Sequence, residues 1–185
     1  MEILLSICIG IGLSAACGFR IFVPLLVVSI AMRAGYCKVS EGFAWLANDA
    51  ALITFAVATI LEILAYYIPW LDNLLDTIAM PVAVVAGVII MASSLGNLSP
   101  YLKWTLSLIA GGGAACSIQF LTSRARVLST GLTGGITNPI LSTAELLTSL
   151  ILSILSIILP LLAIFFIVII FLLIIRGLRK KRFNC

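Results

Sequence analysis

Long runs of apolar residues alternate with short polar connections along this chain. An apolar run of about 20 residues is long enough to cross a bilayer as an α-helix. The pattern predicts spans over 1–32, 50–68, 77–95 and 101–122, followed by a longer apolar region over 139–175. Because the apolar runs are continuous, without the two-residue alternation of barrel strands, they predict an all-α membrane protein and not a β-barrel.

The last apolar region decides the number of spans. As one helix, 139–175 would be about 55 Å long, against a hydrocarbon core of about 30 Å. Splitting it near Pro160 predicts a six-helix transmembrane bundle that forms one domain over residues 1–185. The alternative is five spans, in which the last helix is long, kinked and projects from the membrane.

Several glycines and prolines fall inside or beside the apolar runs. Glycine removes side-chain bulk and proline deletes a backbone donor, so both weaken a helix. The predicted helix breaks are at Gly18, Pro24, Gly112 and Pro139. The first span is therefore expected to be kinked or broken.

Two parts of the chain resemble each other. Leu13-Ser-Ala-Ala-Cys17 is similar to Gly112-Gly-Ala-Ala-Cys116, and each half then has a span with one glutamate and a plain apolar span. Three spans in each half would give repeats over 1–98 and 99–178 with opposite orientations in the membrane. In secondary transporters, such inverted repeats place the binding site near the midplane.

Composition agrees with a membrane protein and narrows its chemistry. Of the 185 residues, 63% are hydrophobic and 10% charged, and the mean hydropathy is +1.28. There is no histidine, and the five cysteines show no C-x-x-C spacing, so no catalytic triad, zinc site or redox pair is indicated. We expect no catalytic residues, no metal, no cofactor and no nucleic-acid partner.

The net charge of +4 comes mostly from a basic tail over 176–185. Basic residues are enriched on the cytoplasmic side, which predicts a multi-pass protein of the cell inner membrane with a cytoplasmic C-terminus. The tail also suits contact with anionic lipids. Small residues at 86–87 and 110–115 are compatible with close helix contacts in a homodimer.

Three charged residues lie within apolar spans: Arg20, Glu62 and Glu145. A charge at the centre of a membrane helix costs about 2.5–3.5 kcal/mol on insertion scales, and such residues often mark a substrate or ion path. Arg20 is the predicted clamp for an anionic group, and the two glutamates are predicted proton carriers. The structural alternative is an arginine–glutamate pair that fixes helix packing.

Polar residues near the ends of the spans are further candidates for substrate or ion binding. Asp72 and Asp76 follow the second span at a spacing that puts both on one helical face. Asn138 precedes Pro139 and suits either a helix N-cap or the border of a broken-helix site. Tyr66, Tyr67 and Trp70 resemble an interfacial aromatic belt.

The motif Gly-Phe-Arg-x-Phe-x-Pro at 18–24 resembles the opening of a family of small bacterial integral membrane proteins, catalogued as a domain of unknown function. The resemblance continues through 62–76 and resumes at 133–139 and 142–145. The family pattern has a charged pair where this chain has Tyr66 and Tyr67, and an acid where it has Leu146. The resemblance implies a membrane location and no specific activity.

The resulting hypothesis is a small transporter or permease with a midplane polar site for a small anionic or amphipathic solute or a lipid, with possible proton coupling. The alternatives are a passive channel or lipid scramblase, and a non-transporting membrane scaffold. An enzyme is disfavoured, since it would have to use carboxylates such as Asp72 and Asp76 with a bound divalent ion.

Overall fold

The computed structural model describes residues 2–37, 40–96, 98–134 and 137–182. Within its helices, the side chains at positions 2, 41, 69–74, 76–77, 132 and 173–182 lie outside the description. The side chains of Asp72, Asp76 and Trp70, and those of the basic residues of the C-terminal tail, are therefore outside the described set.

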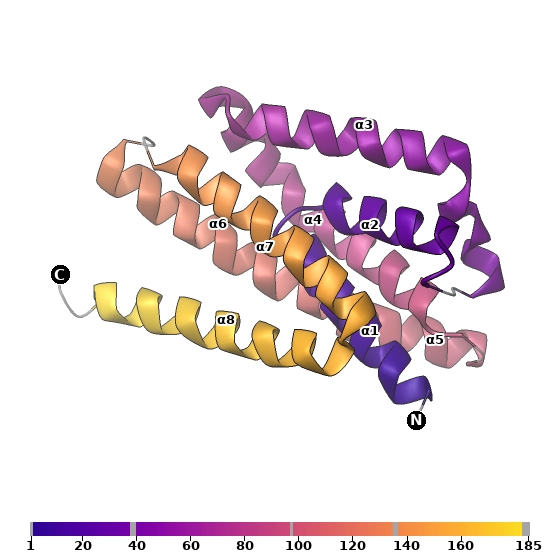
Figure 1. Cartoon of the computed structure of the whole chain (residues 1–185). Coiled ribbons are helices and arrows are strands. Elements are labelled where there is room, and N and C mark those ends of the chain that lie inside the picture. The colour runs from indigo at the N-terminus through magenta and orange to yellow at the C-terminus, as the bar shows by residue number, and fades with distance from the viewer. Residues whose placement is uncertain (1, 38–39, 97, 135–136, 183–185) are drawn as a thin grey trace.

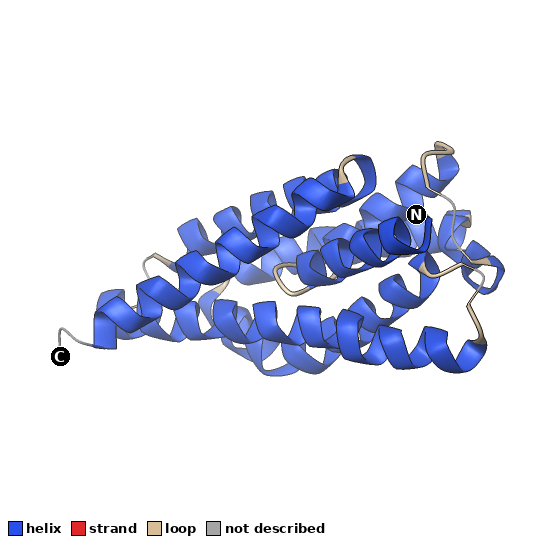
Figure 2. Cartoon of the chain, turned by 90° about the horizontal axis from the view of Figure 1, so that it is seen from below, coloured by secondary structure: helices blue, strands red, loops and turns tan. Residues whose placement is uncertain are grey.

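The described residues form helices joined by short connections, with no strand among them, which confirms the predicted all-α class (Figure 2). The helices and their bounds are as follows: α1 (Glu2–Cys17), α2 (Phe22–Arg33), the 3₁₀ helix η1 (Glu41–Ala47), α3 (Asp49–Tyr66), α4 (Pro69–Ser94), α5 (Pro100–Leu106), the π-helix η2 (Ser107–Gly112), α6 (Gly113–Thr133), α7 (Asn138–Ile158) and α8 (Pro160–Arg182).

The first predicted span folds as a hairpin of two helices, α1 and α2, joined by residues 18–21, the hairpin tip (Figure 1). Both helices lie along α7, but the chain runs toward the tip in α1 and away from it in α2. Arg20 at the tip contacts Ser142 near the start of α7. Gly12 of α1 lies against Ser156, and Ile30 of α2 lines a groove with Ile154, both near the end of α7.

This hairpin corrects the prediction of one broken passage over 1–32. The predicted break at Gly18 is confirmed, but the chain reverses there. A Cβ at Gly18 would lie 2.6 Å from the carbonyl oxygen of Ala115, so only glycine allows α6 to approach the tip this closely. Pro24 lies in the first turn of α2, where a missing N–H costs nothing, and so does not break a helix.

The other long helices run between two ends of the bundle, which we call the tip end, toward the hairpin tip, and the base end, where α1 begins and α2 finishes. Chain passages α3, α5–α6 and α8 run from the base end to the tip end, and α4 and α7 run back (Figure 1). The N-terminus therefore lies at the base end and the C-terminus beyond the tip end (Figures 1 and 2). The predicted six-span bundle is not confirmed by this arrangement.

Among the described residues, three helices are long and apolar enough to cross a membrane: Asp49–Tyr66, Pro100–Gly131 and Asn138–Ile158. Four shorter apolar helical segments accompany them: Ile3–Cys17, Phe22–Arg33, Ile78–Ser94 and Pro160–Leu172. These helices support a membrane-embedded protein.

The last apolar region divides where the sequence predicts. α7 ends at Ile158, Leu159 has an extended backbone, and α8 starts with Pro160. A residue before proline is pushed out of the helical region, which explains the break. α8 turns back and packs against α7, α1 and α6, so the long kinked helix of the five-span alternative does not form.

Two of the small residues at 86–87 and 110–115, Gly87 and Gly111, pack against each other inside the chain. A Cβ at Gly87 would lie 2.8 Å from the carbonyl oxygen of Gly111, and one at Gly111 would lie 2.7 Å from that of Gly87. The backbones of α4 and η2 therefore touch at this crossing. Gly112, a predicted break, ends the π-helix of a segment that stays helical from Pro100 to Thr133. Gly87 and Gly111 thus serve intramolecular packing.

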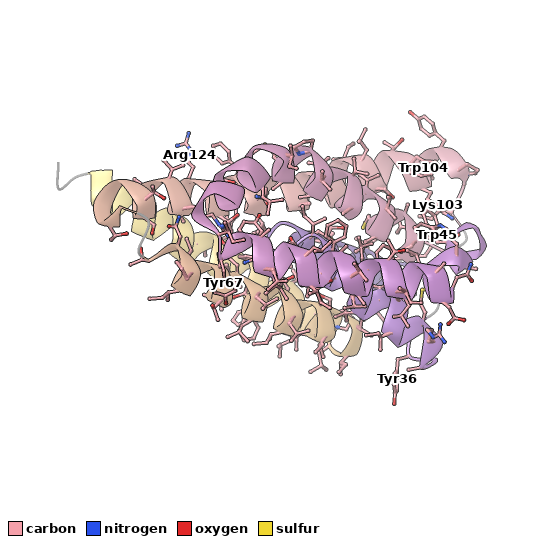
Figure 3. All side chains as sticks on the ribbon, turned by 90° about the horizontal axis from the view of Figure 1, so that it is seen from above. Tyr36, Trp45, Tyr67, Lys103, Trp104 and Arg124 are labelled. Carbon is pink, nitrogen blue, oxygen red and sulfur yellow. The ribbon has the colours of Figure 1, made fainter. Side chains whose placement is uncertain are left out.

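Aromatic side chains mark the base end. Trp45 and Trp104 are about half exposed there, with Lys103 beside them (Figure 3). Trp45 contacts Phe55 with ring centroids 6.3 Å apart, and Trp104 contacts Phe43 at 6.4 Å. Tryptophan is enriched where helices leave the hydrocarbon, so this end suits a membrane surface.

Candidate functional site

Five ionisable or aromatic side chains from four parts of the chain meet beside the hairpin tip. None is more than 7% exposed. We call this set the polar cluster: Arg20 of the tip, Glu62 and Tyr66 of α3, Arg126 of α6 and Glu145 of α7. Two guanidinium groups and two carboxyl groups therefore share one buried region.

Glu145 is held by Arg126. Its Oε1 accepts a hydrogen bond from Arg126 Nε at 3.1 Å, and its Oε2 pairs with Arg126 Nη2. Arg20 lies on the other side of the same carboxylate, with its Nη2 3.9 Å from Glu145 Oε2. That Nη2 also donates to the main-chain carbonyl of Ser142 at 2.9 Å. A buried carboxylate needs such partners, because an unpaired charge is costly away from water.

Tyr66 contacts both cations. Its ring centroid lies 3.9 Å from Arg20 Cζ and 4.1 Å from Arg126 Cζ. Guanidinium groups are attracted to the negative face of an aromatic ring, more strongly when water is excluded. One ring from α3 thereby connects the hairpin tip to α6.

Glu62 binds the backbone of the hairpin. Its Oε1 accepts the N–H of Ile21 at 2.9 Å and its Oε2 accepts the N–H of Phe22 at 3.2 Å. These amides stand at the start of α2, where a helix has donors without partners and favours negative charge. On α1, the carbonyl of Ala16 accepts a hydrogen bond from Ser149 Oγ at 3.0 Å. A side chain of α3 thus satisfies the amides that start α2, and a side chain of α7 adds a hydrogen bond to the last turn of α1, as burial in a membrane favours.

Arg20 remains incompletely paired. Its side chain is 2% exposed, and its Nε and Nη1 have no hydrogen-bond partner among the described residues. Buried polar groups of native proteins nearly always have partners, so each exception needs an explanation. What is missing at Arg20 is a hydrogen-bond acceptor.

A cavity of about 380 Å³ lies next to the polar cluster, between the start of α2, α3 and α4. Glu62 and Tyr66 belong to its wall, and the rest of the lining is apolar. Leu61, Ile78 and Val82 line it and are also substantially exposed on the outer surface of the bundle. The cavity therefore connects an apolar outer face with two members of the polar cluster.

The polar cluster lies between the middle of the bundle and the tip end. Glu145 is the eighth residue of α7, which puts it about 10 Å from the start of a helix about 31 Å long. Glu62 is likewise one turn before the end of α3. An inverted repeat exchanges the two ends of a bundle, so equivalent residues away from its centre lie toward opposite ends. Both glutamates lie toward the same end, and the predicted repeat is therefore not supported.

Of the predicted site residues, the structure brings Arg20, Glu62 and Glu145 together. Asn138 is the first residue of α7, and its Nδ2 donates to Thr130 Oγ1 at 3.1 Å, at the end of α6. Pro139 occupies the first turn of α7, where it starts the helix without breaking it. Asp72 and Asp76 lie outside the described side chains.

Sequence reasoning missed two members of the cluster. Arg126 was assigned to a polar connection over 123–138, whereas α6 continues to Thr133. Its position could have been found from helical periodicity, because Ile118, Thr122 and Arg126 repeat every fourth residue and all are buried. Tyr66 was assigned to the interfacial belt, but it is 6% exposed, whereas the adjacent Tyr67 is exposed and hydrogen-bonds Thr143.

The family comparison confirms the predicted resemblance to a domain of unknown function. The pattern of a domain of unknown function, DUF4126, matches residues 7–180, which includes every member of the polar cluster. The chain belongs to the DUF4126 family. No curated protein and no solved structure matches it. Within the described part of this DUF4126 protein, no three His, Cys, Asp or Glu side chains lie together as metal ligands.

Proposed function

We propose that this protein is a small membrane transporter or permease for an anionic or amphipathic solute or a lipid, with the polar cluster as its substrate site. The unsatisfied Arg20 carries this proposal. In a purely structural ion pair we expect every buried donor to be paired, whereas here Nε and Nη1 of a buried guanidinium have no acceptor among the described residues.

The cluster members have distinct proposed roles. Arg20 binds the anionic group of the substrate, because a guanidinium suits carboxylate and phosphate oxygens. Arg126 and Glu145 hold each other and thereby position Arg20. Glu62 is the proposed coupling acid, since taking up a proton would weaken its hold on the amides of Ile21 and Phe22 and release the tip.

We also propose how the chain sits in a cell inner membrane. α3, α4, α5–α6, α7 and α8 form five passages, and α1–α2 is a hairpin that enters from the base end. Arg124, Arg126 and the basic residues of α8 belong to the tip end, against Arg33 and Lys103 at the base end. The excess of basic residues makes the tip end, with the C-terminus, the proposed cytoplasmic side.

Charge movement in proteoliposomes on a solid-supported membrane tests the transport proposal. The probes are hexanoate and hexyl phosphate, applied as concentration jumps with and without a proton gradient. We expect currents from the parent protein that fall at least tenfold in Arg20→Gln and Glu62→Gln, and that persist in Arg124→Gln, an exposed arginine outside the cluster. Undiminished currents in both cluster variants would remove the assigned roles.

A lipid scramblase is the second candidate, favoured by the opening of the cavity onto exposed apolar residues. Its sign would be transbilayer movement of a fluorescent phospholipid without any ion gradient, measured by dithionite quenching in proteoliposomes. Quenching of both leaflets in the parent and of one leaflet in Arg20→Gln would favour this function over a coupled transporter.

A further inference from the structure

The cavity beside the polar cluster restricts what the substrate can be. Its volume of about 380 Å³ falls within the usual range of small-molecule sites, which are mostly apolar with a few placed polar groups. Apart from Glu62 and Tyr66, α2, α3 and α4 present only apolar side chains to it. Such a wall suits a hydrocarbon chain and not a small hydrophilic ion.

The outer wall of the cavity faces the expected lipid. Leu61 is 60% exposed and Ile78 is 49% exposed, on helices that run between the two ends of the bundle. A molecule dissolved in the bilayer can therefore reach the cavity sideways, between α3 and α4, without crossing water. A larger groove of about 740 Å³ between α2 and α7 is also apolar, but it offers no charged side chain to a head group.

The inner wall leads to Arg20. The ring of Tyr66 belongs to the cavity wall and lies in contact with the Arg20 guanidinium. Ile21, the next residue in the chain, also belongs to the wall. A ligand that fills the cavity is therefore separated from Arg20 by one residue layer.

The hydrogen-bond partners around Arg20 indicate the charge of the head group that would bind there. Glu145 is engaged by Arg126, and Glu62 is engaged by two amides at the start of α2. Neither carboxylate forms a hydrogen bond with Arg20 Nε or Nη1. The unfilled demand is thus for an acceptor, and oxyanions are the acceptors that a guanidinium binds best.

We propose that the cavity binds an acidic amphiphile from the membrane, with its alkyl chain between α3 and α4 and its phosphate or carboxylate head directed toward Arg20, which the head reaches when the Tyr66 ring turns aside. This inference rests on the proposed function, because it names the substrate class of the same site. It adds the route, sideways from the bilayer, and the requirement for both an alkyl chain and a negative head.

Native mass spectrometry of the full-length protein in neutral detergent tests this binding directly. The probes are dodecyl phosphate, dodecanoate, inorganic phosphate and uncharged dodecanol. Ala58→Leu fills the cavity without changing the polar cluster, and Ala50→Leu is its matched control at an exposed position of the same helix. Arg20→Gln removes the charge, and Arg124→Gln is the control for that change.

We expect the parent, Ala50→Leu and Arg124→Gln to retain dodecyl phosphate or dodecanoate at least tenfold more than Ala58→Leu and Arg20→Gln. Equal retention by Ala58→Leu would overturn the cavity as the binding place. Equal binding of inorganic phosphate would overturn the need for a chain, and equal binding of dodecanol would overturn the need for a negative head.

The binding and transport results are separable. Retained amphiphile without any current or lipid movement would refute the proposed transport function and leave the binding site standing. Full transport of hexyl phosphate by Ala58→Leu would refute the cavity as the substrate route and leave the transport function standing.

Discussion

Among single residues, Arg126 determines whether the buried charges tolerate one another. It forms two contacts with Glu145 and also lies against Tyr66. Removing one partner of a buried pair leaves the other charge without compensation, whereas replacing both with apolar residues is often nearly neutral. The stability of the bundle should therefore depend more on the matching of these charges than on their presence.

Replacing Arg126 with alanine is expected to lower the free energy of unfolding by about 3–5 kcal/mol, because Glu145 loses both of its close contacts with a guanidinium and keeps only the 3.9 Å contact with Arg20. The double change Arg126→Met with Glu145→Leu should cost much less than this. Unfolding in mixed detergent micelles, followed by circular dichroism, measures both. Arg124→Ala is the matched control, since this arginine is exposed and its guanidinium lies over the Phe120 ring, 4.5 Å from the ring centroid. A loss as large in Arg124→Ala would contradict the assignment.

The sequence identifies three charged residues that are costly to bury in a membrane, but it does not identify all of their partners. Arg20, Glu62 and Glu145 stand out because each is a charge within an apolar run, and the structure brings the three together. Arg126 and Tyr66 do not stand out, because each lies one or two residues from a residue of the same kind, Arg124 or Tyr67, that is exposed. Only the exact helical phase decides which of two such neighbours faces inward.

At the scale of elements, the contact between α4 and η2 depends on glycine at the positions where the two helix backbones touch. Three successive glycines, 111 to 113, look equivalent in the sequence, but their surroundings differ. A Cβ at Gly111 would lie 2.5 Å from the Cβ of Met91, whereas one at Gly113 would meet nothing within 4 Å. The helix crossing therefore requires glycine at one of these positions and not at the other.

Gly111→Ala is expected to destabilise the protein by about 1–3 kcal/mol through overpacking. Gly113→Ala should be neutral or stabilising by up to about 1 kcal/mol, because alanine favours the helix more than glycine does. Thermal unfolding of both variants in the same detergent gives the comparison. Equal effects of the two substitutions would mean that α4 and η2 do not approach as described.

The start of α2 depends on a side chain from α3. Glu62→Gln replaces an acceptor pair with one acceptor and one amide group, so one of the two tip amides loses its partner. We expect the amides of 21–23 to exchange with deuterium about fivefold faster, given the extra strength of hydrogen bonds to charged groups. Mass spectrometry of peptides covering the tip measures this. Asp49→Asn, which alters a carboxylate at the other end of α3, should leave the tip unchanged.

At the scale of the whole molecule, the hairpin decides at which end of the bundle the first segment begins, because α1 and α2 together return the chain to the end from which it started. Residues 1–32 are long enough for one passage, and hydropathy alone cannot reveal that the chain reverses at Gly18. The reversal depends on Glu62, which accepts the amides at the start of α2 from a helix far along the sequence. The break at Pro160, by contrast, is local and could be predicted. Elements that depend on local chemistry were therefore predictable, and the path of the first segment was not.

The two arrangements place the N-terminus on different sides of the membrane. With the hairpin, Ile3→Cys in a background without other cysteines should react with a membrane-impermeant maleimide on intact cells, as Tyr36→Cys does at the base end. Arg124→Cys, at the tip end, should react only after lysis. Six passages predict that Ile3→Cys behaves like Arg124→Cys, so this labelling pattern decides between them.

The position of α1 has a consequence for biosynthesis. This helix leaves the ribosome first, yet the surfaces that bury it belong to α4, α6, α7 and α8, which are translated later. During that delay the amides of Ile21 and Phe22 lack their acceptor, Glu62, although backbone groups without hydrogen-bond partners are poorly tolerated in hydrocarbon. The nascent α1–α2 hairpin must therefore be kept out of the hydrocarbon core, by an insertase or by residence in the interfacial region, until the last helix has been synthesised.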